Sequence, residues 1–327
     1  MSHDRHVEQM MDDSERFDLL AIPSTDLERR VLRRRVCSGE LVEPHPGMFA
    51  RAEVWAALKW KVRAWRVVRT YASLHPDCVF CSMTAAFIHG LWVPKSEVMG
   101  AIHVVGPHAR VSRGVMIHAI NDSEVDLVGD LMVTSSLRTA FDCMAALDFR
   151  NGLAVGDSLA RACSLNQAEL LDMLANRYAG YRGMGSVRLV MPHVDARSES
   201  GGESYARAVM IENQVMVPEL QVEVPRPDGS GRVYRFDYYW DLPHPVRMPV
   251  AGARPFSQVG GELDGMEKTE DEGMLGGRSM NRAYRDERTR ESQITALGIP
   301  VLRFTFDMAR DTWPLLKTLD MFGIPRG

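Results

Sequence analysis

Two carboxylates and a lysine are spaced for chemistry in one short stretch, residues 259–269, which reads "VGGELDGMEKT". Glu262 and Asp264 stand two residues apart, and Lys268 follows four residues after the second acid. Residues two apart in a strand share a face, so these carboxylates would lie together. Clustered acids repel one another at neutral pH unless a divalent cation neutralises them. The stretch therefore predicts either a solvated strand end or a metal site that cuts phosphodiesters.

The strand before it supplies a third acid, Asp237, within "RVYRFDYYW" at residues 232–240. Strict alternation gives four aromatic residues of this strand one shared face. They are Tyr234, Phe236, Tyr238 and Trp240. Asp237 would lie on the other face and converge with Glu262 on Mg²⁺ or Mn²⁺, whose bound water can attack phosphorus in line. Lys268 would stabilise the developing charge or orient the water. The alternative makes Asp237 and Glu262 surface acids on an edge of the sheet.

The elements around these acids alternate between helix and strand and predict an α/β core. A helix at 203–214 precedes strands at 219–224 and 232–240, which the turn "PRPDGSG" joins. A helix in "RAYRDERTRESQITALG" and a strand in "IPVLRFTF" complete the core. The small polar residues at 195–204 are typical of a linker, so a domain would begin near residue 198.

Positive charge is concentrated near the N-terminus. Between Arg29 and Arg69, eleven Lys and Arg stand against three acids, in a chain whose formal net charge is −4. Such a surplus attracts a polyanion. Five of these arginines fall in one predicted helix that would enter the major groove of DNA. They are Arg29, Arg30, Arg33, Arg34 and Arg35.

That helix has start and stop signals, and a hairpin follows it. Ser24 or Thr25 can cap it, with Glu28 placed for a capping box, and Gly39 ends it. The sequence "ELVEPHPGMFA" then predicts two short strands around a Pro-Gly turn, with His45 at the wing tip as a further DNA contact. Helix, helix and hairpin are the order of a winged helix-turn-helix. The alternative is a solvated basic helix on an ordinary small domain.

The middle of the chain, residues 56–195, reads as an α/β segment without a catalytic constellation. Cys78 and Cys81 have CxxC spacing, but one pair is a weak zinc signal and buried thiols are favoured. Arg138 and Asp142 are spaced to pair on one helix face. No apolar run approaches the roughly 18 residues of a membrane helix, and the polar N-terminus argues against a secretory signal. Together with sparse cysteines, these features predict a cytoplasmic protein with no membrane partner.

Four ordered motifs between residues 198 and 307 carry a family resemblance. They are "GESYAR", "RFDYYW", "GGELDGMEK" and "RDERTRESQITALGIPVLRF". The segment resembles the PD-(D/E)xK nuclease-like domain related to the very-short-patch repair endonuclease. The resemblance implies that Asp237 and Glu262 ligate Mg²⁺ or Mn²⁺, that Glu203 is a helix-borne acid of the site, and that Lys268 is its trailing basic residue. Asp264 stands where the family has the lysine of its ExK motif.

The rest of the chain is similar to a second family. "LRRRVCSGELVEPHPGMFA" resembles the wing, and "VTSSLRTAFDCM" the middle signature, of winged-helix AbiEi-like antitoxin regions. Antitoxins of this type bind promoter DNA and repress transcription of their operon. The resemblance therefore implies a transcriptional regulator with double-stranded DNA as partner, and it makes a cognate toxin protein a second candidate partner.

These observations predict an α/β (α+β multidomain) chain with three domains. They are a winged helix-turn-helix at 1–54, an AbiEi-like α/β domain at 55–197, and a restriction-endonuclease-like mixed sheet flanked by helices at 198–327. The expected function is DNA binding of a bacterial defence or toxin–antitoxin type, with a nuclease-like domain that hydrolyses DNA phosphodiesters. The alternative is a transcriptional repressor or antitoxin whose nuclease-like domain is catalytically inert.

Overall fold

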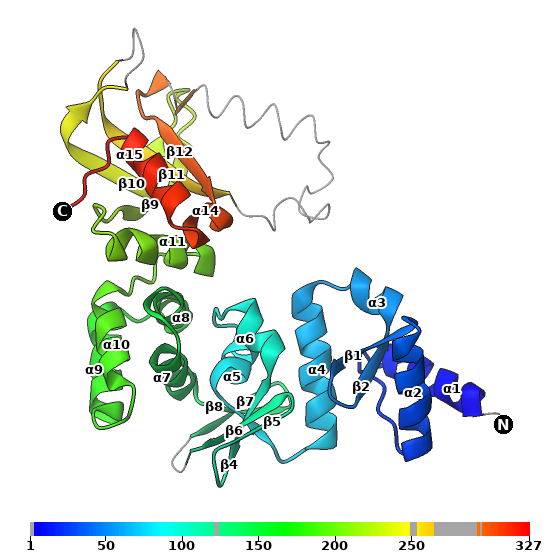
Figure 1. Ribbon diagram of the computed structural model, residues 1–327. Coiled ribbons are helices and arrows are strands. Elements are labelled where there is room, and N and C mark those ends of the chain that lie inside the picture. The colour runs from blue at the N-terminus through cyan, green and yellow to red at the C-terminus, as the bar shows by residue number, and fades with distance from the viewer. Residues whose placement is uncertain (1–2, 121–123, 249–253, 265–292, 295) are drawn as a thin grey trace. The chain divides into compact units, whose positions relative to one another are not determined.

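The computed structural model describes residues 3–120, 124–248, 254–264, 293–294 and 296–327 (Figure 1). The chain forms two compact units, Met1–Cys143 and Met144–Gly327. Each unit combines helices with β-sheet, so the predicted α+β multidomain class is confirmed. The finer division into three domains stays a prediction.

The first unit begins with two helices and a hairpin, in the predicted order. Helices α1 (His3–Arg16) and α2 (Asp26–Cys37) precede the antiparallel strands β1 (Leu41–His45) and β2 (Met48–Arg51). One apolar cluster joins these elements, because each contributes at least one fully buried side chain. Its members are Val7, Met11, Ala21, Leu32, Leu41 and Phe49. The spacing of apolar residues on both helices thus fixes which face of α2 is turned away from solvent.

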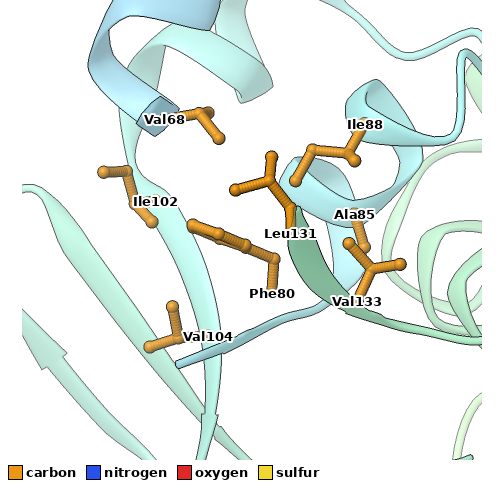
Figure 2. Packing of buried hydrophobic residues seen from close by; sticks show 8 residues of the cluster. All are labelled: Val68, Phe80, Ala85, Ile88, Ile102, Val104, Leu131 and Val133. Carbon is orange, nitrogen blue, oxygen red and sulfur yellow. The ribbon is translucent and has the colours of Figure 1, made fainter. Parts of the chain in front are cut away.

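The remainder of the first unit is a six-stranded sheet with helices packed on it, in the strand order β5-β6-β4-β3-β8-β7. The strands are β3 (Val79–Phe80), β4 (Ile102–Gly106), β5 (Arg110–Ser112), β6 (Val115–Ala119), β7 (Val125–Val128) and β8 (Leu131–Thr134). The helices of this part are α4 (Trp60–Leu74), α5 (Ser82–Ile88) and α6 (Lys95–Gly100), while α3 (Ala52–Ala57) packs on the β1–β2 hairpin. Helix α7 (Ser136–Ala146) spans the boundary between the two units. Figure 2 shows Phe80 at the centre of the core, between Val68 of α4 and Ile88 of α5.

The second unit begins with helices, continues with a four-stranded sheet and ends with two further helices. The helices are α8 (Phe149–Cys163), α9 (Gln167–Tyr178), α10 (Met184–Val190), the short 3₁₀ helix Met191–His193, α11 (Gly201–Glu212), α14 (Phe306–Arg310) and α15 (Trp313–Met321). The strands are β9 (Glu219–Pro225), β10 (Val233–Val246), β11 (Phe256–Asp264) and β12 (Val301–Thr305), in the order β12-β11-β10-β9. Strands β9, β10 and β11 are antiparallel neighbours, whereas β12 runs parallel to β11. This sheet is mixed, as the resemblance implied.

The segment 195–204, predicted as a linker, is packed into the second unit. Ser198 and Ser204 are buried, and their hydroxyl oxygens lie 2.8 Å apart. The backbone N–H of Asp195 donates to Asp157 of α8 at 2.8 Å. The prediction of a linker is therefore corrected, because Ser198 and Ser204 have buried hydrogen-bond partners within the unit.

The alternation of β10 breaks at Asp237. Phe236 packs over Gly260, where a Cβ would lie 2.5 Å from the ring, whereas Trp240 packs over the neighbouring Gly261. Adjacent residues of a strand face opposite sides, so Phe236 and Trp240 lie on opposite faces of the sheet. The prediction of four aromatic residues on one face is therefore wrong. The pairing with β9 omits Asp237 and Gln221 without a change of register, and Gln221 has φ +55°, so the irregularity lies at this pair of residues.

Candidate nucleic-acid interface and acidic site

Helix α2 begins with the capping box that the sequence predicts. The hydroxyl of Thr25 accepts the N–H of Glu28, and the carboxylate of Glu28 accepts the N–H of Thr25 and of Ser24. Such reciprocal bonds satisfy the otherwise unpaired N–H groups of the first turn. Because Glu28 and Leu32 are buried, the opposite side of the helix is left to solvent.

Four of the five predicted DNA-contacting arginines share that solvent side. Arg29, Arg30, Arg33 and Arg34 are exposed, at spacings of three and four residues that bring side chains together on a helix. Arg33 approaches Glu43 of β1 only to 3.9 Å. Neither Arg29 nor Arg34 has an ion-pair partner within the described residues. The face therefore holds several uncompensated positive charges.

Arg35 belongs to a different environment. Its guanidinium forms ion pairs with Glu8 of α1 and, at 3.3 Å, with Glu40, and its side chain is only 14% exposed. Glu8 also pairs with Arg51 of β2 at 3.0 Å. The prediction that Arg35 contacts DNA is corrected, because its charge is neutralised inside the unit, where it joins α1 to α2.

His45, predicted at an exposed wing tip, is buried. Its Nε2 donates to the carbonyl oxygen of Gly114 at 2.8 Å, and its ring meets Tyr71 edge-on at 6.2 Å between centroids. Burial lowers the pKa of His45, so the ring is neutral near pH 7. The prediction that His45 contacts DNA is corrected, because the turn between β5 and β6 covers its side chain.

A second polar cluster lies where α11 meets the four-stranded sheet. Asp237 accepts the backbone N–H of Leu263 at 2.9 Å. Glu203 of α11 accepts three bonds, from the N–H of Glu199, the hydroxyl of Ser200 and the amide of Gln221, at 2.8 to 3.1 Å. Burial raises the pKa of Glu203, and the nearby negative charge of Asp237 raises it further. The charges of Glu203 and Asp237 therefore interact, and that the two residues belong to one site stays a prediction.

An arginine stands beside the other two acids. The parallel register of β11 and β12 places Glu262 opposite Arg303. The guanidinium of Arg303 lies 2.8 Å from Asp264 and 3.7 Å from the buried carboxylate of Glu262. Glu262 and Asp264 therefore share a face, as expected, but the cation next to them is Arg303. Sequence reasoning missed this residue, although it sits in the quoted "VLRF" strand. Lys268 lies outside the described residues.

The carboxylates differ in their capacity to hold a divalent cation. The carboxylate of Glu203 already accepts three bonds, and Asp264 is held by Arg303. Asp237 and Glu262 flank the same stretch of β11, since Asp237 bonds to the residue that follows Glu262. Mg²⁺ needs only one or two carboxylates and completes its shell with water. These two residues are the ones that fit the predicted metal, with Arg303 as a competing cation. The described residues contain no group of three or more candidate ligands.

A pair of histidines in the first unit was not singled out from the sequence. His103 of β4 and His118 of β6 stack at 5.0 Å, and Nδ1 of the first lies 3.0 Å from Nε2 of the second. Burial, with the neighbouring His118, lowers the pKa of His103 to about 4. The rings share one N–H between them and are neutral at physiological pH. The signal in the sequence that could have indicated this pair is one histidine in each of two apolar strands.

Two proteins of Mycobacterium tuberculosis are similar to this chain. They are uncharacterized protein MT2308 of strain CDC 1551 / Oshkosh and uncharacterized protein Rv2248 of strain ATCC 25618 / H37Rv. Each is 30% identical over 196 residues, which cover 55% of this chain and 69% of the relative. The chain belongs to the family of these mycobacterial proteins. No family model and no solved structure matches it.

No helix among the described residues has both the length and the apolar character needed to cross a membrane.

Proposed function

We propose that this protein binds double-stranded DNA through the exposed arginines of α2, as a regulator of the defence or toxin–antitoxin type. The observation that carries the proposal is the arginine face itself: Arg29, Arg30, Arg33 and Arg34 on one side of a capped helix. A helix fits the major groove, and guanidinium groups bind phosphate oxygens through charge-assisted bonds. The hairpin β1–β2 that follows α2 supports a winged helix-turn-helix arrangement.

Fluorescence anisotropy with the full chain and a labelled duplex from upstream of its own gene tests the proposal. Affinity should fall steeply between 50 and 200 mM salt, because phosphate contacts release counterions. The double substitution Arg29→Ala, Arg33→Ala should weaken binding on the order of tenfold and flatten the salt dependence. Arg188→Ala, an exposed arginine of α10, is the matched control. An affinity for the duplex that changes neither with salt nor with the α2 substitutions would overturn the proposal.

A second candidate function is hydrolysis of DNA phosphodiesters in the second unit. It is supported by the grouping of Asp237 with Glu203 and with the β11 stretch that carries Glu262. A divalent cation held by Asp237 and Glu262 would supply an activated water. The chain's own part would be to fix these carboxylates: Leu263 orients Asp237 through its N–H, and the burial of Glu262 limits its movement.

Assays of plasmid cleavage and of cation binding distinguish the hypothesis of an active nuclease from that of a catalytically inert domain. Nicking that requires Mn²⁺ or Mg²⁺ and is lost in Asp237→Asn and in Glu262→Gln supports the nuclease. Mn²⁺ binding should be lost in the same variants, measured by calorimetry without DNA. DNA binding without nicking, together with repression of a reporter placed behind the upstream duplex, supports the repressor or antitoxin alternative.

A further inference from the structure

The turn of the hairpin formed by β5 and β6 packs against the turn of the β1–β2 hairpin, residues 41–51, which we call the wing. Ser112 pairs with Val115, so Arg113 and Gly114 make its two-residue turn. The carbonyl oxygen of Gly114 accepts the 2.8 Å bond from His45. Gly114 has φ +77°, and a Cβ there would lie 2.8 Å both from Nε2 of His45 and from Cδ of Pro46. The contact is thus a close backbone approach that only glycine permits.

This hairpin carries positive charge and no acid. Residues 107–119, "PHARVSRGVMIHA", contain Arg110 and Arg113 but neither Asp nor Glu. Both arginines are exposed, and neither has an ion-pair partner in the part of the chain that the structure describes. Even an exposed arginine that forms an ion pair contributes little to the free energy of folding. The fold therefore does not account for these two charges.

Direct contacts connect the hairpin to the arginine face of α2. Arg33 approaches Glu43 of β1 at 3.9 Å, and Glu43 accepts the N–H of Gly47 at 2.8 Å. Gly47 follows Pro46, and Pro46 lies against Gly114. Arg113 immediately precedes Gly114 in the turn of the second hairpin. Both groups of arginines thus adjoin the same turn of the β1–β2 hairpin.

We propose that Arg110 and Arg113 form a second phosphate-binding surface, which grips the backbone of the same DNA duplex that α2 enters. The inference rests on the proposed DNA binding and extends it to the six-stranded sheet. Guanidinium groups on α2 and on the β5–β6 hairpin, both beside the turn of the β1–β2 hairpin, complement a duplex with one negative charge per about 1.7 Å of its axis. Such contacts position the duplex without reading its bases, so this surface contributes affinity rather than sequence preference.

The test compares four full-length proteins by anisotropy over a range of salt: wild type, Arg110→Ala with Arg113→Ala, Arg29→Ala with Arg33→Ala, and the control Arg188→Ala. Loss of two phosphate contacts should reduce the salt slope by about two and weaken binding roughly tenfold at 150 mM salt. The loss should be equal on the upstream duplex and on a shuffled duplex. Replacing both hairpin arginines by lysine should restore most of the slope.

The outcomes distinguish this inference from the function on which it rests. If the α2 variant loses affinity while the hairpin variant matches Arg188→Ala, the second surface does not exist and the α2 interface stands. If neither variant differs from the control, DNA binding through α2 fails together with its extension. Both arginines are exposed, and unchanged circular dichroism and melting temperature would show that the fold persists in the hairpin variant.

Discussion

Asp157 and Arg207 form an ion pair that is almost completely removed from solvent, with 2.7 Å between Oδ2 and Nη2. The pair joins α8 to α11. Further bonds support the pair, since Asp157 also accepts the N–H of Asp195 and Arg207 donates to the carbonyl of His193 at 2.6 Å. Helix α11, which precedes the four-stranded sheet, is therefore fixed to α8.

Breaking this pair should destabilise the second unit strongly. Arg207→Met leaves the carboxylate of Asp157 buried without its cation, at a cost of about 3 to 5 kcal/mol in the free energy of unfolding. Urea unfolding measures the loss. The control is Arg197→Ala, which removes an exposed partner of Asp195 and should cost about 1 kcal/mol or less. Similar values for the two variants would contradict a structural role of the buried pair.

The histidine pair predicts a dependence of stability on pH in the first unit. The pKa of His103, about 4, lies below its value near 6.5 in an unfolded chain, and burial also lowers the pKa of His118. A depressed pKa gives stability that is complete above pH 6.5 and is lost as the pH falls towards 4. The loss attributable to His103 is at most about 3 kcal/mol. Unfolding of wild type and His103→Asn at pH 7.5, 6 and 5 tests this, and parallel curves would contradict it.

Arg303 should compete with divalent cations for the carboxylates of β11. Arg303→Gln removes the positive charge beside Glu262 and Asp264, so the two carboxylates repel each other more strongly. A bound divalent cation would offset this repulsion. The variant should therefore gain more thermal stability from Mn²⁺ than the wild type does; a tenfold gain in affinity adds about 1.4 kcal/mol at saturation. Arg310→Gln, which disrupts an exposed pair with Asp307, is the matched control. Equal shifts in all three proteins would argue against competition.

Gly114→Ala should destabilise the packing of the β5–β6 turn against the β1–β2 hairpin. The added methyl group meets His45 and Pro46 at 2.8 Å and forces a non-glycine residue into a positive φ, for a cost of about 1 to 3 kcal/mol. Gly129→Ala is the control, because its φ of +65° carries similar strain while no atom lies within 4 Å. The difference between the two variants in urea unfolding measures the contact alone. No difference would indicate that the hairpin is not held by this approach.

Local features of the structure followed from the sequence. The capping box of Thr25 and Glu28 depends on residues three apart, and the pairing of Arg138 with Asp142, at 3.0 Å, on residues four apart. The hairpin β1–β2 forms around the predicted Pro-Gly turn. Such signals are read from neighbouring residues, whose geometry a helix or a tight turn fixes by itself.

The features that the sequence did not reveal depend on distant partners. His45 is buried because Gly114, 69 positions later, covers it. Asp237 departs from strict alternation at a point where the pairing of two strands is interrupted. Arg303 meets Asp264 across 39 positions and through a parallel register that no local pattern specifies. For the candidate site, the sequence therefore identified the acids but not the cation beside them.

The parallel pairing of β11 with β12 also orders events during synthesis. Gly260 pairs with Val301, so about forty further residues must leave the ribosome before β11 acquires its second neighbour. Until then Glu262 and Asp264 stand on a growing chain without the guanidinium that later accompanies them. A nascent chain stalled before Val301 would carry an uncompensated acidic strand, and its charge would help keep that open edge from joining other strands.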